Sequence, residues 1–457
     1  MTFSEYVDDL KNKRVTVVGA GVSNTPLIEA LLLSGVDTTV CDQRADLGEA
    51  AGRFRGLGAT LKLGDGYLDS IDADVIFRTP GVTPRNPAIA AAVRSGALLT
   101  SEMEAFFDVC PCKIIGVTGS DGKTTTTSII AKLLENAGYR VHIGGNIGSP
   151  LLCQADGFHP DDIAVLELSS FQLITMSRSP DIAVYTNLSP NHLDVHADMV
   201  EYAGAKRNIF IHQGHSGRAV FNFDNEHTRA EAGLARGETL FFSRFEKLSD
   251  GVFLDVGTIF ESANGQNEEI VKTRDVLLPG VHNLENFMAA FAAVRGLVDR
   301  DIMRETARVF HGVKHRIELV RELRGVRFYN DSIASSPSRT IAGLRSFGQK
   351  VILIAGGKDK GVGFDELGGE IVKTVKTLVL TGMTAQLIRD AVSKARGNLD
   401  SPEILMCDDF NDAVTSAANA AIAGDVVLLS PACTSFDRFN NFEERGDVFR
   451  EIVNGLA

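Results

Sequence analysis

The amino-acid sequence predicts an α/β protein of three domains: an N-terminal Rossmann-like domain, a central P-loop domain with a mostly parallel sheet, and a C-terminal Rossmann-like domain. Two observations lead to this prediction. The chain has 457 residues, which is too long for one ordinary domain. Short apolar strand patterns alternate with helical patterns in three successive stretches, which is typical of parallel sheets covered by helices on both faces.

The first stretch begins with a buried-strand pattern at residues 14–18, followed by the turn Gly19-Ala20-Gly21 and a helical pattern. A second strand pattern follows at residues 38–41, so this segment is predicted to be a βαβ unit with a glycine turn at its first strand end. A weaker strand pattern at residues 73–77 extends the unit. We expect this domain to span residues 1–110.

The second stretch contains one long helical pattern, at residues 124–137, behind a glycine-rich turn. Segment 215–275 alternates short β-like runs with polar turns, and we interpret it as peripheral strands of the same domain, residues 111–312. The apolar strand patterns of this stretch cover residues 113–118, 164–168 and 182–186. The third domain is expected at residues 313–457, with strand patterns at 326–329, 351–355, 377–380 and 426–430.

The composition excludes several classes of protein. A net charge of −13 and the absence of tryptophan argue against a nucleic-acid-binding surface, so no nucleic-acid partner is expected. No apolar run reaches the roughly 18 residues that span a bilayer, and the polar, acidic N-terminal segment is not a signal peptide. We therefore expect a cytoplasmic protein without membrane insertion. The six cysteines are scattered, and we interpret them as reduced thiols.

A glycine-rich loop, GVTGSDGKTT at residues 116–125, lies between an apolar strand and a helical pattern. Glycines let such a loop turn its N–H groups, and the helix N-terminus, toward an anion. Lys123 is suited to phosphate oxygens and the Thr124 hydroxyl to Mg²⁺. The strict P-loop pattern has glycine where Val117 stands, so an ordinary strand–helix turn is the alternative. The flanking strand and helix favour a P-loop ATPase-like domain.

The turn after the first strand is a weaker signal. Gly19 and Gly21 match the start of the dinucleotide-binding pattern, but Asn24 replaces its third glycine. Asp42 ends the second strand, where an acidic side chain can bind a ribose. A nucleotide sugar fits this partial match as well as NAD does, and a tight turn without a ligand is the third interpretation.

Two further segments follow apolar strands of the central domain, where open α/β sheets bind ligands. Glu167 ends one strand, and a carboxylate beside a phosphate loop commonly reaches Mg²⁺. His192 follows another strand, so the two side chains are expected to converge at one sheet edge. Lys206, by its pattern alone, is predicted to be an ordinary surface lysine. In the third domain Asp331 follows the first strand and is suited to a ribose or an amino group.

These motifs, in this order, resemble the Mur ligase family along nearly the whole chain. The motifs that carry the resemblance are TGSDGKTTT at 118–126, GGNIG at 144–148, ELSSFQL at 167–173, NLSPNHLD at 187–194, GVHNLENFMAA at 280–290, HRIE at 315–318 and LLSPACTSFDRFNNFEERG at 428–446. The last is most similar to members that add D-glutamate. The resemblance implies an ATP-dependent amide ligase that joins D-glutamate to UDP-N-acetylmuramoyl-L-alanine through an acyl phosphate, in peptidoglycan synthesis.

The resemblance also implies ATP and two Mg²⁺ ions as cofactors, small-molecule substrates and a monomer. The implied ATP-binding residues are Gly119, Ser120, Asp121, Gly122, Lys123, Thr124, Thr125, Asn286, Arg316 and Asp331. The implied substrate-binding residues are Gly21, Val22, Ser23, Asp42, Arg44, Asn146 and Ser169 on the nucleotide-sugar side and Ser335, Lys360, Ser435 and Phe442 for D-glutamate. The implied catalytic residues are Lys123, Glu167, His192 and Lys206, and the implied metal ligands are Thr124, Glu167, His192 and a carbamylated Lys206.

The sequence departs from the family pattern in two places. Ser120-Asp121 stands where Thr-Asn is usual, and Ile333 replaces a usual lysine, for which Lys314, Lys358 or Arg339 could supply the charge. Three alternatives to the ligase remain open from the residues: a folylpolyglutamate synthetase, a nucleotide-binding protein without catalysis, and an NAD-linked oxidoreductase. The long segment before the phosphate loop argues against the first, and Asn24 argues against the last.

Overall fold

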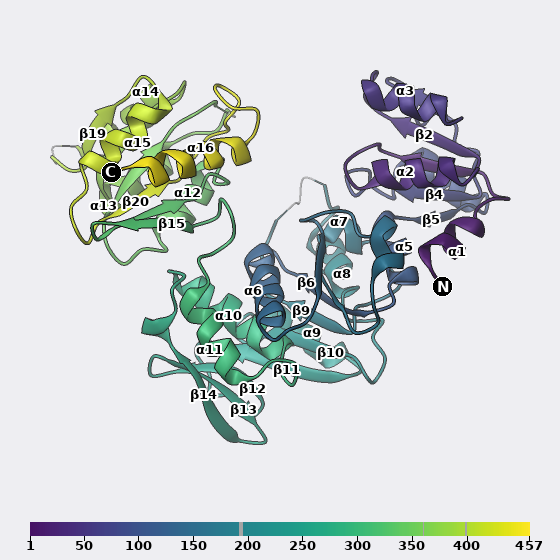
Figure 1. Ribbon diagram of the computed structural model, residues 1–457, viewed down its shortest axis with the longest axis horizontal. Helices are drawn as coiled ribbons and strands as arrows, with labels where there is room; N and C mark the ends of the chain where they lie inside the picture. The colour runs from purple at the N-terminus through teal and green to yellow at the C-terminus, as the bar shows by residue number, and fades with distance from the viewer. Residues whose placement is uncertain (192–194, 360, 398–399) are drawn as a thin grey trace. The chain divides into compact units, whose positions relative to one another are not determined.

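The computed structural model describes residues 1–191, 195–359, 361–397 and 400–457 (Figure 1). The chain forms two compact units, one of residues 1–272 with 285–306 and the other of residues 273–284 with 307–457. The described residues form three sheets, two in the first unit and one in the second. The α/β class is thus confirmed, whereas the predicted limits of the three domains stay a prediction.

The first sheet is wholly parallel and has the strand order β3-β2-β1-β4-β5. The strand order reverses at β1, whose four residues are all buried, and open α/β sheets bind ligands beside such a point. The strands are β1 (Val15–Val18), β2 (Thr38–Asp42), β3 (Thr60–Leu63), β4 (Val75–Arg78) and β5 (Leu98–Thr100). The helices are α1 (Phe3–Asp8), α2 (Asn24–Leu33), α3 (Glu49–Gly56), α4 (Pro87–Arg94) and α5 (Glu102–Val109).

The second sheet has the order β14-β13-β12-β11-β10-β9-β6-β8-β7, and it is parallel except for the β12–β13–β14 meander. Its strands are β6 (Lys113–Thr118), β7 (Val141–Gly145), β8 (Ile163–Glu167), β9 (Ile182–Tyr185), β10 (Arg218–Asn222), β11 (Glu238–Ser243), β12 (Gly251–Asp255), β13 (Thr258–Ala263) and β14 (Gln266–Lys272). Its helices are α6 (Lys123–Asn136), α7 (Ser170–Leu173), α8 (Met199–Arg207) and α9 (Glu226–Glu231), followed by α10 (Val281–Ala293) and α11 (Arg300–Val309).

The register of this sheet determines which loops meet. Strand β6 lies between β8 and β9, and all three run parallel. Val117 pairs with Glu167, and Thr118 pairs with Tyr185. The loops that leave the three strands therefore begin side by side at one sheet edge, as the sequence predicted for Glu167.

The third sheet, in the second unit, has the order β15-β16-β20-β17-β18-β19, with only β15 antiparallel. Its strands are β15 (Glu318–Leu323), β16 (Val326–Asn330), β17 (Val351–Ala355), β18 (Val375–Leu380), β19 (Glu403–Met406) and β20 (Val426–Leu429). Its helices are α12 (Pro337–Leu344), α13 (Asp365–Thr374), α14 (Ala385–Arg396), α15 (Phe410–Asn419) and α16 (Phe442–Gly455). The central strands β17 and β20 are fully buried, which explains their continuous apolar sequences.

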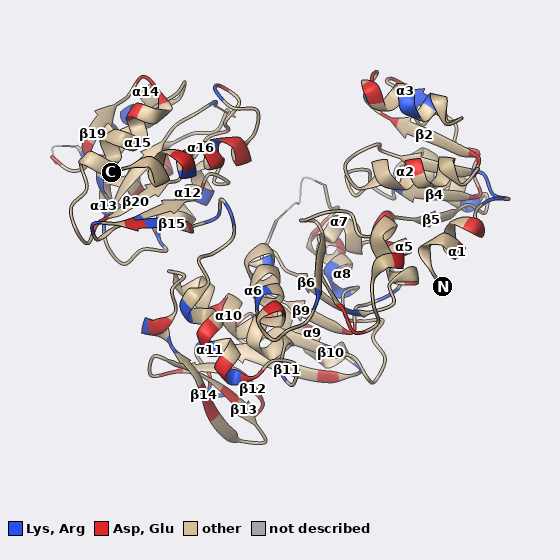
Figure 2. Ribbon diagram, viewed as in Figure 1, with Lys and Arg blue, Asp and Glu red and all other residues tan. Residues whose placement is uncertain are grey.

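Charged side chains of both signs are interspersed over the elements, for example on α3, and no element is uniformly basic in the view of Figure 2. Within the described residues, none of the helices combines the length and apolar character needed to cross a membrane. All six cysteines are free thiols, as predicted.

Candidate active site

The phosphate loop runs from the end of β6 to Lys123, the first residue of α6. Gly119 has φ 153° and Gly122 has φ 79°, and residues other than glycine rarely adopt these backbone conformations. A Cβ atom at Gly119 would lie 1.9 Å from Thr186 Oγ1, and one at Gly122 would lie 2.4 Å from Asn286 Oδ1. Both positions therefore require glycine, and Asn286 of α10, which the resemblance assigned to ATP, lies against the start of α6.

The segment after β9 holds the loop in shape. Ser120 N donates to Asn187 O (3.0 Å), and Asp121 N donates to Asn187 Oδ1 (2.9 Å). The Thr186 hydroxyl donates to Asp121 O at 2.6 Å. Asn187 was not among the predicted site residues, although it opens the NLSPNHLD motif. Its backbone carbonyl holds Ser120 and its side chain holds Asp121.

Lys123 folds over this loop. Its Nζ donates to Gly119 O and to Ser120 O, each at 2.9 Å. The ammonium group thus stands at the N-terminus of α6, where helix N–H groups already favour an anion. The combination of a lysine, a glycine loop and a helix N-terminus is suited to a phosphate chain.

Glu167, at the end of β8, contacts two other predicted site residues. Its Oε2 accepts a hydrogen bond from Thr124 Oγ1 (2.6 Å), and its Oε1 accepts one from Asn146 Nδ2 (2.7 Å). Glu167 itself is buried, with 2% of its surface exposed. The Glu167 carboxylate and the Thr124 hydroxyl fit the preference of Mg²⁺ for hard oxygen ligands. Within the described part of the chain no cluster of three or more acidic, His or Cys side chains is suited to a metal.

Lys206 is not a surface residue, so the prediction made from its pattern alone is wrong. The side chain belongs to α8 and is 2% exposed. Tyr202, four residues earlier, and Ile209 and Phe210, three and four residues later, are also buried. This spacing places Lys206 on the inner face of the helix. The apolar neighbours at helical spacing were the signal that could have revealed it.

The Lys206 amine lies directly behind the phosphate loop. Its Nζ donates to Gly119 O at 2.7 Å and to Thr118 Oγ1 at 3.3 Å, and it lies 4.9 Å from the centre of the Tyr202 ring. Burial, and after it the positive charge of Lys123, hold the pKa of Lys206 well below its ordinary range. A neutral amine is therefore accessible at this position. His192 and Lys360, two other predicted site residues, lie outside the residues that the structure describes.

In the first sheet, Asp42 ties the turn after β1 to the end of β2. Its carboxylate accepts hydrogen bonds from Ala20 N (2.9 Å), Arg44 N (2.9 Å) and the Arg44 guanidinium (2.8 and 2.9 Å). The Arg44 side chain lowers the pKa of Asp42 to about 2. Gly21 faces open space, since a Cβ there would meet nothing within 4 Å, and Val22 is 81% exposed. The predicted residues thus lie together around an accessible turn.

Asn24, the departure from the dinucleotide pattern, has a structural role. The side chain is buried, and its Nδ2 donates to Gly19 O at 2.9 Å and to Val18 O at 3.4 Å. Ser23 precedes α2 without a side-chain cap. In the central domain, Ser169 is the N-cap of α7, where it forms a capping box with Gln172. The structure therefore gives Ser169 a structural role and leaves Ser23 accessible to a ligand.

In the second unit, Asp331 lies at the end of β16. It is buried, and it accepts hydrogen bonds from Ser430 Oγ (2.8 Å) and Ile317 N (3.3 Å). Burial raises the pKa of Asp331 to about 7. Arg316 stands between His315 (φ 63°) and Ile317 (φ 44°), two residues in the left-handed region. Such strained backbone persists where the surrounding structure fixes it, and it is frequent at functional sites.

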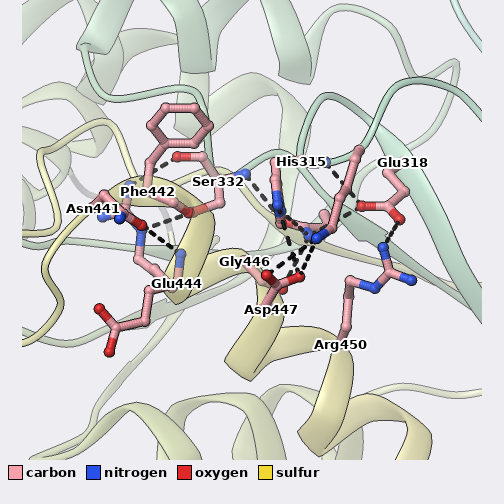
Figure 3. A network of polar contacts seen from close by, with 12 residues as sticks. His315, Glu318, Ser332, Asn441, Phe442, Glu444, Gly446, Asp447 and Arg450 are labelled. Carbon is pink, nitrogen blue, oxygen red and sulfur yellow. Dashed lines mark hydrogen bonds and ion pairs between the residues drawn. The ribbon is translucent and has the colours of Figure 1, made fainter. Parts of the chain in front are cut away.

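The segment after β16 packs against the start of α16 (Figure 3). Ser332 Oγ donates to Phe442 O at 2.8 Å, and the Phe442 ring meets His315 edge-on at 6.1 Å between centroids. Ser435 is buried in the loop before α16, and Ser335 is partly buried. The segments that carry the predicted Ser335 and Phe442 are thus brought together within this unit.

Arg445 is a residue of this region that the sequence reasoning missed. It is 2% exposed, and its guanidinium donates to Ser332 Oγ (3.0 Å), Ser332 O (2.8 Å) and Cys433 O (3.1 Å). It therefore places a cation beside Ile333, where the family has a lysine. Of the three predicted substitutes, Lys314 pairs with Asp447 and Arg339 contacts the Ile333 carbonyl. The position of Arg445 in the FEERG motif was the sequence signal that could have revealed its role.

The phosphate loop, its parallel sheet and the Glu167 contact define a P-loop nucleotide-binding protein. Residues 117–294 match the Mur ligase middle domain, and residues 315–433 match the Mur ligase, glutamate ligase domain. The chain belongs to the Mur ligase family.

Curated relatives are similar over the full length. A UDP-N-acetylmuramoylalanine--D-glutamate ligase of Acetivibrio thermocellus is 51% identical, over 99% of this chain and 98% of that protein. A protein of the same name from Clostridium novyi is 47% identical, over 100% of this chain and 99% of its own.

Solved structures share the fold. The UDP-N-acetylmuramate-alanine ligase MurC of Thermotoga maritima matches with a TM-score of 0.58 and 17% identity, over 97% of this chain and 99% of that one. The MurF ligase of Thermotoga maritima in complex with ADP matches with a TM-score of 0.56 and 20% identity, over 99% of this chain and 97% of that one. The predicted fold class and family are thereby confirmed.

The role of Asn24 leads to a testable prediction. Asn24→Gly restores the dinucleotide pattern but removes the hydrogen bonds to Val18 and Gly19, so the variant should lose about 1–2 kcal/mol of unfolding free energy. It should not gain NAD binding. Urea unfolding followed by circular dichroism, with calorimetry of NAD binding, measures both. Asn264→Gly is the matched control, because Asn264 has φ 52° and glycine should be tolerated there. NAD binding by the Asn24 variant would contradict this interpretation of the turn.

Proposed function

We propose that this chain joins D-glutamate to UDP-N-acetylmuramoyl-L-alanine with the hydrolysis of ATP to ADP and phosphate. The observation that carries the proposal is the Glu167 carboxylate, which contacts both Thr124 of the phosphate loop and Asn146. The proposed substrates are those in the name of curated relatives, the UDP-N-acetylmuramoylalanine--D-glutamate ligases, which are similar to this chain over the full length. These substrates are found where ATP and amino acids are available, so the proposed location is the cytoplasm, and we expect the monomer to be active.

The reaction must first activate a carboxylate, which is a poor acylating agent. In the proposed mechanism an oxygen of the alanine carboxylate attacks the γ-phosphorus of ATP, ADP leaves, and an acyl phosphate forms. Lys123 and the N-terminus of α6 counter the charge of the phosphate chain as the two anions approach. Asn286, beside Gly122, is suited to the nucleotide. Arg316 and Asp331 are proposed to complete nucleotide binding.

The oxygen donors around Glu167 fit the Mg²⁺ that the proposed reaction uses. Thr124, Glu167 and His192 would hold it, with a carbamate on Lys206 as a further ligand. When bound, Mg²⁺ supplies charge neutralisation at the phosphate oxygens. The residues of the chain do the rest: Asn146 and Thr124 orient the Glu167 carboxylate through the hydrogen bonds that they donate.

In the second step the amine of D-glutamate attacks the acyl carbon and phosphate leaves, which forms the amide. The amine must lose one proton, for which the His192 neighbourhood and a phosphate oxygen are the candidate acceptors. Ser335, Lys360, Ser435 and Phe442 are proposed to bind D-glutamate. Gly21, Val22, Ser23, Asp42 and Arg44 are proposed to bind the uridine diphosphate, and Asn146 its sugar side.

The environment of Lys206 supports the proposed carbamate. A neutral amine adds CO₂ and releases one proton, whereas an ammonium group does not react. Burial favours the neutral amine at Lys206. The product is an anion behind the phosphate loop, where it can serve as a metal ligand.

The direct test is an assay of ADP release with UDP-N-acetylmuramoyl-L-alanine and a panel of D- and L-amino acids. D-glutamate should stimulate release, and L-glutamate should not. Release without any amino acid dependence would support a nucleotide-binding protein of another kind. Stimulation by L-glutamate on a folate substrate would support the folylpolyglutamate alternative.

Lys123→Ala should reduce ADP release on the order of 10²–10³-fold, because it removes a preorganised cation from the transferring phosphoryl group. The fold should persist, since the glycine conformations and the Asn187 hydrogen bonds shape the loop. Circular dichroism checks the fold, and Lys132→Ala, on the exposed face of the same helix, is the control. A well-folded Lys123 variant with normal turnover would remove the phosphate-loop assignment.

Lys206→Ala should lose most activity, and short carboxylic acids should restore part of it by occupying the vacant anion position. His192→Ala should not be rescued in this way, because it removes a neutral ligand. Steady-state ADP release with and without added acetate measures both. Lys272→Ala, an exposed lysine, is the matched control. Arg207→Ala is less suitable, because Arg207 pairs with Glu231 through two contacts of 2.6 Å. Full activity of Lys206→Ala in CO₂-depleted buffer would exclude the carbamate.

A further inference from the structure

A second cluster in the central domain, formed by Ser170, His196 and Glu201, lies outside the residues assigned above. His196 Nε2 is 2.9 Å from Ser170 Oγ, and His196 Nδ1 is 3.3 Å from Glu201 Oε2. Arg85 Nη2 also lies 3.3 Å from the same Glu201 oxygen. The histidine therefore links the first residue of α7 to the first turn of α8.

The surroundings of His196 favour one tautomer. Nδ1 lies 3.3 Å from the Glu201 carboxylate, which attracts a proton on that nitrogen. Nε2 then accepts a hydrogen bond from the Ser170 hydroxyl. Burial lowers the pKa of His196, which favours this neutral ring. A hydrogen bond between Ser170 and His196 and a 3.3 Å contact between His196 and Glu201 thus join the three side chains.

The order serine, histidine, carboxylate is also that of hydrolase triads. Here, however, Ser170 is 2% exposed and His196 is 4% exposed, so neither side chain is accessible to a substrate. The His196 ring is stacked on Phe171, with 5.2 Å between centroids and 7° between planes. The arrangement favours a role in fixing positions over one in nucleophilic catalysis.

Two connections lead from this cluster to the phosphate loop. Ser170 follows Glu167 by three residues, and Leu168 O between them accepts a hydrogen bond from Thr118 Oγ1 at 2.7 Å. On the other side the His196 ring packs against Tyr202, with 5.2 Å between centroids, and the Tyr202 hydroxyl lies 3.1 Å from Ser120 Oγ.

We propose that His196 is a positioning residue: held by Glu201, it fixes Ser170, and through Ser170 it sets the place of the Glu167 carboxylate beside Thr124. This inference rests on the proposed function, because it assigns Glu167 to Mg²⁺ and ATP. A small shift of the turn after β8 would separate Glu167 from Thr124, whose hydrogen bond is 2.6 Å long. Loss of a residue that orients a metal ligand, without binding the metal itself, typically lowers metal affinity or activity about 10–100-fold.

His196→Phe is the informative variant, because it keeps a ring to stack on Phe171 and removes both nitrogens. ADP release should fall on the order of 10-fold in kcat, and half-saturation with Mg²⁺ should need more metal. The KM for D-glutamate should not change. His196→Gln, whose amide oxygen can accept from Ser170, should recover part of the loss. His227→Phe, an exposed histidine on α9, is the matched control.

A double-mutant cycle separates positioning from general stability. If His196 acts through Ser170, then Ser170→Ala should cause a similar loss, and the double variant should be no worse than either single variant. Normal kcat and normal Mg²⁺ dependence in folded His196→Phe would overturn the proposal, as would strictly additive losses. If His196→Phe does not fold, Ser170→Ala alone decides by the same two readouts.

The Mg²⁺ dependence of ATP binding, measured by calorimetry on the same variants, does not depend on the amino-acid substrate. A wild-type protein that binds Mg²⁺ and ATP but shows no D-glutamate stimulation would contradict the proposed function only. A wild-type protein with D-glutamate stimulation and variants with unchanged Mg²⁺ dependence would contradict the role of His196 only.

Discussion

The hydrogen bond between Thr124 and Glu167 is the contact on which the candidate site depends. It joins the first turn of α6 to the end of β8, and it is possible because β6 lies between β8 and β9. A parallel sheet delivers its loops to one edge. The phosphate loop, the Glu167 carboxylate and the segment that begins at Asn187 therefore meet without any long connection, and each fixes the conformation of the others.

A buried amine behind the loop is the second constraint. The desolvation of Lys206 is unfavourable for a charged group, and two hydrogen bonds to the loop offset it only in part. Proteins retain such groups chiefly where a perturbed pKa is useful. The second unit also contains a buried basic side chain. Arg445 has serine and carbonyl partners, and burial lowers its pKa to about 10.

Much of the fold was predictable because buried parallel strands are continuous apolar runs, as at β6 and β17. The strands that the sequence patterns missed, such as β3 and β19, are edge strands with exposed or partly exposed side chains, so no apolar run marks them. Glu167 was predictable because it ends a strand. The burial of Lys206 and Arg445 was not predicted from the sequence pattern, because it depends on tertiary packing. A charged residue is predicted to lie at the surface by default. Asn24 appeared to be a defect in a motif, whereas its amide holds the turn.

The central claim is that ATP activates a carboxylate of the substrate at this loop. It is tested most directly by labelling the alanine carboxylate of UDP-N-acetylmuramoyl-L-alanine with ¹⁸O and analysing the released phosphate by mass spectrometry. The acyl-phosphate route transfers one labelled oxygen to phosphate in each turnover, because the oxygen that attacks the γ-phosphorus leaves with it. Phosphate without label, in a reaction that still forms the amide, would contradict the account.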